Sequence, residues 1–164
     1  MNGLTWIDIL LRLIPEGLII ILAGYAVSKK AVKIKPYLLS SIIFALITFI
    51  LKMLPVSAAL PMILSATTAV LLLVFINKIK VIHAVISTII CLLLSVLFEG
   101  LNIFLLEKIF SIGTNEIYNN ANPIFKQLVM LPSLLLFAAI VVIYYFIMMK
   151  ITKKNVTKNV VTIE

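Results

Sequence analysis

Charged residues are scarce in this sequence, and acidic residues are the scarcest. Only 12% of the 164 residues are charged, with six acidic residues against fourteen basic ones, while 63% are hydrophobic. A soluble domain carries about 25% charged residues. Because the polar surface is too small to cover a water-soluble globule, the composition predicts an integral membrane protein.

Cysteine and histidine are each present once, as Cys91 and His83. One cysteine excludes an internal disulfide, and a site made of several soft metal ligands needs more than these two residues. The sequence also lacks a glycine-rich phosphate loop and a zinc-protease motif. We therefore expect no cofactor, no metal and no enzymatic activity.

Long apolar runs make up most of the chain, and each has about the 20 residues that a helix needs to cross a bilayer. Backbone groups in lipid must form their hydrogen bonds within their own segment, so the runs are predicted to be helices. The expected fold is all-α: a five-helix transmembrane domain over residues 1–150 and a short basic cytoplasmic tail over 151–164. The five runs span residues 7–28, 37–54, 58–77, 81–106 and 124–149.

The basic residues indicate the orientation of these helices. Ten of the fourteen lie in the segments 29–35, 78–80 and 150–158, which occupy alternate gaps and the C-terminal end. Because cytoplasmic loops are enriched in lysine and arginine, we expect the N-terminus outside and the C-terminus inside a bacterial cytoplasmic membrane. Their place beside apolar runs favours the bilayer as partner and argues against nucleic acid.

Ionisable residues inside the apolar runs are the candidate functional residues, because charge at membrane depth is costly. Counted from the inner lysines at 1.5 Å per residue, Glu16 lies about 20 Å, Lys52 about 25 Å and Glu99 about 28 Å from the inner face. We expect Arg12, Glu16, Lys52, Glu99 and Asn102 to form an outward-facing ligand pocket, with Glu16 paired to Arg12 or Lys52. The alternative is that Lys52 extends to the interface and the glutamates sit at hydrated helix ends.

The stretch KVIHAVISTIIC places Cys91 eight residues after His83. It is similar to the His and Cys of membrane peptidases of the accessory gene regulator family, which cut a signalling-peptide precursor. That family has glycines before the histidine and a spacing of seven, which this sequence lacks. The other interpretation is a headgroup-level histidine and an inert, buried cysteine.

Three short motifs resemble the membrane-embedded sensor region of Firmicute sensor histidine kinases of the accessory-gene-regulator-like or sporulation type. They are Pro15-Glu16, the stretch from Lys52 to Pro55, and Asn122-Pro123. The kinases continue into phosphoacceptor and ATP-binding domains, whereas about 14 residues without histidine follow Lys150 here.

The resemblance implies a non-enzymatic sensory or regulatory module that detects a small ligand or peptide and signals to a membrane or cytoplasmic partner. A homodimer is compatible with such a module. The alternatives are the membrane subunit of a small-molecule importer, which the size and hydropathy fit, and the peptidase.

Overall fold

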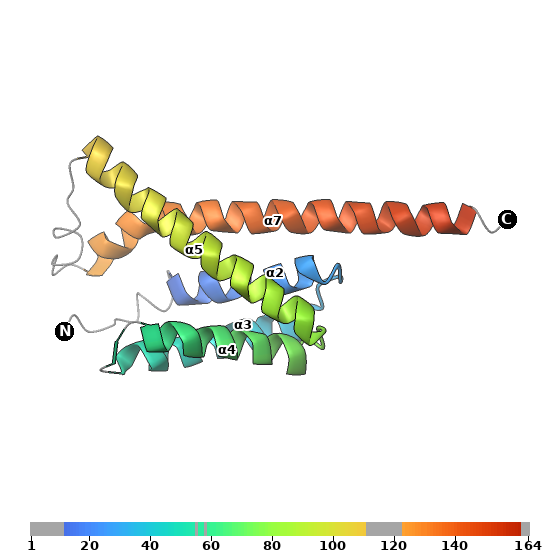
Figure 1. Ribbon diagram of the computed structural model, residues 1–164, viewed down its shortest axis with the longest axis horizontal. Helices are drawn as coiled ribbons and strands as arrows, with labels where there is room; N and C mark the ends of the chain where they lie inside the picture. Colours follow the sequence, from blue (N-terminus) through green and yellow to red (C-terminus); the bar gives the residue numbers. More distant parts are fainter. Residues whose placement is uncertain (1–11, 55, 58, 111–122, 162–164) are drawn as a thin grey trace.

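The computed structural model describes residues 12–54, 56–57, 59–110 and 123–161. This part of the chain is all-helical, as the sequence predicts. Its elements are the helices α2 (Ile14–Val27), α3 (Ile34–Met53), α4 (Ala59–Phe75), α5 (Val81–Phe110) and α7 (Pro123–Val161). Figure 1 shows α2, α3 and α4 side by side, with α5 crossing obliquely over α2 and the long α7, which pack directly against each other.

Three of the helices are long and apolar enough to cross a membrane, over Ile34–Met53, Val81–Lys108 and Leu128–Thr152. The other two, α2 and α4, are apolar but shorter, with 14 and 17 residues. The first predicted run began at residue 7, and residues 7–11 lie outside the described part. The expected tail begins within α7, whose backbone is helical as far as Val161.

Prolines mark the helix starts where the sequence places them. Pro15 lies at the first positions of α2, Pro36 in the first turn of α3, and Pro123 opens α7. Proline suits these positions because the first N–H groups of a helix have no intrahelical acceptor. Pro132 lies inside α7, and the first turns of this helix tilt away from the rest in Figure 1.

The lysine-rich turns meet at one end of the bundle. Lys29 and Lys78 both adopt the left-handed backbone conformation, with φ of 54° and 51°, just after a helix ends. The ammonium of Lys30 donates a 2.7 Å hydrogen bond to the carbonyl of Lys78, so the two turns are in direct contact. The two lysine-rich turns therefore lie at the same end of the bundle.

A buried polar network stabilises this lysine-rich end. Tyr25 donates to Asn77 Oδ1 at 2.8 Å, and Asn77 Nδ2 donates to Ser40 Oγ at 2.9 Å and to the Leu72 carbonyl at 3.0 Å. Ser40 in turn donates to the Pro36 carbonyl at 2.7 Å. The network joins α2, α3 and the turn after α4, and satisfied buried networks of this kind rigidify a core.

Helix α7 contacts the lysine-rich end through one hydrogen bond and then continues alone. The hydroxyl of Tyr145 accepts a 3.2 Å bond from the backbone N–H of Val32. From Tyr145 to Val161 the helix rises roughly 24 Å further. Figure 1 shows this half of α7 extending beyond the ends of the other helices.

Small residues allow α2 to lie close to its neighbours at the centre of the bundle. A Cβ at Gly17 would lie 2.9 Å from the carbonyl oxygen of Ser41 on α3, and a Cβ at Gly24 would lie 2.9 Å from Leu73 Cδ1 on α4. Without a difference in polarity between core and lipid, such close packing provides much of the attraction between membrane helices. The contact at Gly17 holds the start of α2, where Glu16 lies, against the middle of α3.

Candidate functional site

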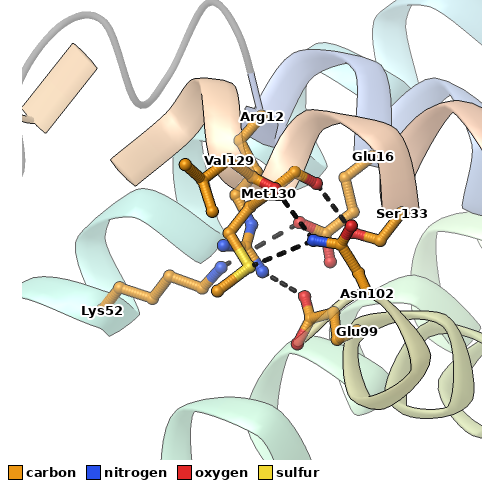
Figure 2. Close-up of polar contacts among 8 residues, drawn as sticks. All are labelled: Arg12, Glu16, Lys52, Glu99, Asn102, Val129, Met130 and Ser133. Carbon is orange, nitrogen blue, oxygen red and sulfur yellow. Dashed lines mark hydrogen bonds and ion pairs between the residues drawn. The ribbon is translucent and has the colours of Figure 1, made fainter. Parts of the chain in front are cut away.

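Four of the five predicted site residues converge at the end of the bundle opposite the lysine-rich turns. Arg12 precedes α2, Glu16 lies in its first turn, Lys52 lies in the last turn of α3, and Glu99 lies on α5. The Arg12 guanidinium donates to Glu99 Oε1. Lys52 Nζ lies 4.0 Å from Glu16 Oε2. Figure 2 shows the four side chains directed toward one another, so the predicted pairing of Glu16 with Lys52 is confirmed.

These charges line a cavity of about 410 Å³ between α2, α3, α4 and α5. Ligand pockets in proteins typically have volumes of roughly 300–1,000 Å³, so this one is large enough for a small molecule. Its other polar lining residues are Thr48, Ser65 and Ser95. Its apolar lining comes from Leu54, Val56, Pro61, Met62, Leu92 and Val96.

Glu16 lies at the junction of this cavity and two small ones. A cavity of about 20 Å³ lies toward α7, and one of about 30 Å³ lies toward Cys91 on α5. Glu16 and Ser95 line all three. A change in the charge or position of Glu16 therefore alters the lining of all three cavities.

Hydrogen-bonding capacity is left over inside the cavities. Among the described residues, Glu16 Oε2 and the hydroxyls of Thr48 and Thr88 are buried without a hydrogen-bond partner. Thr48 is only 3% exposed and Thr88 only 4%. Hydroxyls in membrane helices can bond to the carbonyl one turn back, as Thr68 does here. The two free hydroxyls can instead serve a guest molecule or water.

Neither threonine was among the site residues predicted from the sequence. Thr48 precedes Lys52 by four residues and therefore shares its helix face, a spacing that could have identified it. Thr88 precedes Ser95 by seven residues and therefore lies on the face of α5 that carries Ser95 and Glu99, which is a comparable signal.

The two acid–base pairs differ in how completely they are formed. Arg12 and Glu99 are hydrogen-bonded to each other, whereas Glu16 and Lys52 are in charge contact at a distance too long for a hydrogen bond. The side chain of Lys52 is 35% exposed and that of Glu16 is 21% exposed. Arg12 and Glu99 therefore satisfy each other. In the other pair, Lys52 keeps N–H donors and Glu16 keeps an acceptor that another molecule can use.

Asn102, the fifth predicted residue, is not among the residues that line the cavity. Its side-chain amide donates a 2.8 Å hydrogen bond to the Val129 carbonyl on α7 and lies 4.0 Å from the sulfur of Met130. Figure 2 shows it one turn beyond Glu99. Asn102 therefore links α5 to α7 beside the cavity rather than inside it.

The structure separates His83 from Cys91. Both lie on α5, and eight residues of helix place them about 12 Å apart along the axis. Cys91 is 2% exposed and lines the small cavity that contains Glu16 and Thr88, whereas His83 does not line it. Among the described residues no group of three histidine, cysteine, aspartate or glutamate side chains is placed to hold a metal ion.

Comparison of the whole chain with known proteins found no matching family model, no matching curated protein and no matching solved structure.

Proposed function

We propose that this protein is a non-enzymatic sensory or regulatory module of a bacterial cytoplasmic membrane, in which the charged cavity binds a small ligand or peptide and α7 transmits the signal. One observation carries the proposal. Glu99 on α5 is bonded to Arg12 at the cavity, and Asn102, three residues later, is bonded to the α7 backbone. The cavity and α7 are thus joined by less than one turn of α5.

This arrangement supports transmission in physical terms. A ligand that competes for Arg12 or Glu99 changes the position of α5 relative to α2, and Asn102 transfers that change to α7. The small cavity between α2, α5 and α7 gives the side chains Met130 and Phe137 some room to rearrange. The C-terminal half of α7, which extends beyond the bundle, is the segment we propose to contact a membrane or cytoplasmic partner (Figure 1).

In the proposed topology all five helices span the bilayer, with the N-terminus outside and the lysine-rich turns in the cytoplasm. Contact between the two lysine-rich turns supports the placement of both on the same side of the membrane. The cavity then lies toward the outer side. The same topology and the same Pro15-Glu16 and Asn122-Pro123 motifs underlie the resemblance to histidine-kinase sensor regions.

The topology can be tested by introducing single cysteines into a Cys91→Ser variant and labelling them with a maleimide that does not cross membranes. Ala31 lies in the first lysine-rich turn and Ser57 in the connection between α3 and α4, and both are exposed. We expect a cysteine at 57 to react in intact cells and one at 31 to react only after permeabilisation. The reverse pattern would overturn the orientation.

The sensory role is tested in the native host by comparing transcript profiles of four strains. These carry the wild-type gene, a deletion, Glu16→Gln, or the matched control Glu107→Gln. Glu107 is an exposed acidic residue on α5 that does not line the cavity. We expect Glu16→Gln to reproduce the deletion profile and Glu107→Gln to match the wild type. A deletion without effect, or a Glu16→Gln strain identical to the wild type, would contradict the proposal.

A further inference from the structure

The large cavity is amphiphilic, and its apolar side reaches the outer surface of the bundle. Val56, Met62 and Val96 line it and are also 43%, 47% and 59% exposed. They come from the α3–α4 connection, α4 and α5, so the cavity opens sideways near the seam between α4 and α5. In a bilayer, apolar surface of this kind faces acyl chains. A molecule already in the membrane can therefore enter without passing through water.

The polar side of the cavity has free groups of both signs. Glu16 Oε2 is a buried acceptor without a hydrogen-bond donor, and Thr48, which lines the same cavity, is 3% exposed and has an unpartnered hydroxyl. Lys52, at 4.0 Å from Glu16, carries three N–H donors. A guest that satisfies all of them brings a hydrogen-bond donor with positive charge to Glu16 and an anionic acceptor to Lys52.

We infer that the cavity binds a zwitterionic amphiphile of the phosphatidylethanolamine type. Its primary ammonium donates to Glu16 and to Thr48, its phosphate accepts from Lys52, and its acyl chains leave the cavity along Val56, Met62 and Val96. The four charged residues of the cavity sum to zero, which suits a guest with no net charge. Phosphatidylcholine has no N–H to donate, and phosphatidylglycerol has no cation for Glu16.

The inference rests on the proposed function, since it names the ligand class of the proposed sensing site. The experiment measures binding alone, without a signalling readout. The purified protein could bind the lipid while the deletion and Glu16→Gln strains keep the wild-type transcript profile. That result would contradict the sensory role and still support the lipid site.

The test uses the full-length protein, purified in detergent and depleted of lipid. Dioctanoyl phosphatidylethanolamine, phosphatidylcholine and phosphatidylglycerol are titrated by isothermal calorimetry, together with glycerophosphoethanolamine, the same headgroup without chains. We expect phosphatidylethanolamine to bind at least about 10-fold more tightly than the other two lipids, because each of them loses a charge-assisted hydrogen bond. The chainless headgroup should bind more weakly than the lipid.

Variants locate the site. Glu16→Gln and Lys52→Met should each weaken phosphatidylethanolamine binding by about 10-fold or more, again through a lost charge-assisted bond. The controls Glu107→Gln and Lys108→Met change exposed residues of the same types on α5 and should bind as the wild type does. Thr48→Val, which preserves shape, and Val96→Trp, which fills the lateral opening, should also weaken binding.

Circular dichroism and gel filtration identify any variant that has not folded, and Thr48→Val keeps the test valid if a charge variant fails. Equal affinity for the three lipids would overturn the inference, as would unchanged phosphatidylethanolamine binding in folded Glu16→Gln protein. Binding of the chainless headgroup as tight as that of the lipid would overturn the lateral, amphiphilic part of the site.

Discussion

Replacing Gly17 by alanine should separate the two helices that hold Glu16 and Lys52 together. An alanine Cβ at this position would lie 2.9 Å from the Ser41 carbonyl oxygen and 3.1 Å from Phe44 Cδ1. Optimal non-bonded separations are about 3.5–4.0 Å. The Ser41 oxygen belongs to the α3 backbone and cannot rotate away, so α2 and α3 must move apart by several tenths of an ångström.

Gly100 is a matched control for the same substitution. It also lies inside a helix, α5, but apart from its own stretch of helix nothing lies within 4 Å of the place where its Cβ would be. Glycine to alanine in a helix interior gains about 0.8–1 kcal/mol of helix propensity, and this gain is shared by both variants. The difference between them therefore isolates the packing cost at Gly17, for which overpacking gives about 1–3 kcal/mol.

The free energy of unfolding of both variants can be measured by steric trapping, or by titrating the detergent-solubilised protein with dodecyl sulfate and following circular dichroism. We expect Gly17→Ala to be less stable than Gly100→Ala by about 1–3 kcal/mol. Equal stability of the two variants would refute the close approach of α2 and α3. Because Glu16 is the neighbour of Gly17, Gly17→Ala should also lower the affinity for any ligand bound between Glu16 and Lys52.

Three other outcomes follow from individual contacts. Tyr25→Phe should cost about 1–3 kcal/mol in the same unfolding assay, because it leaves the buried Oδ1 of Asn77 without a donor; an unchanged stability would contradict this. Asn102→Leu removes the bond to the Val129 carbonyl, so the distance distribution between spin labels on α5 and α7 should broaden, and an identical distribution would show that this bond does not join the helices. Cys91, at 2% exposure, should react with a maleimide only after unfolding in dodecyl sulfate, and rapid labelling of the folded protein would be inconsistent with its packing.

Local sequence was enough to predict the class and the helical elements. The scarcity of charge predicted a membrane protein, and three helices are long and apolar enough to cross a membrane. The apolar runs gave four helix positions to within a few residues, from α3 to the start of α7. Pro36 and Pro123 lie in the first turns of α3 and α7, where the fixed backbone angle of proline suits a helix start. These features depend on the chain's own backbone and on its solvent, so they can be derived without knowing which helices are neighbours.

The candidate site was predictable only in part. Depth along each helix follows from counting residues, and Glu16, Lys52 and Glu99, which were expected at similar depths, line one cavity. The direction in which each side chain points does not follow from counting. Asn102 shares a face of α5 with Glu99 in the sequence, yet it bonds to α7, while Thr48 and Thr88 face the cavities without having been expected there.

The sequence by itself determined that this is a helical membrane protein with lysines at one end and isolated charges toward the other. Only the tertiary structure decided that Arg12 pairs with Glu99, that Lys52 faces Glu16, and that a cavity lies between them. The physical reason is that the lipid-facing and buried sides of a membrane helix are almost equally apolar, so hydropathy does not fix helix rotation. Rotation and neighbours are set by close contacts such as that between Gly17 and Ser41, which exist only once the helices have packed.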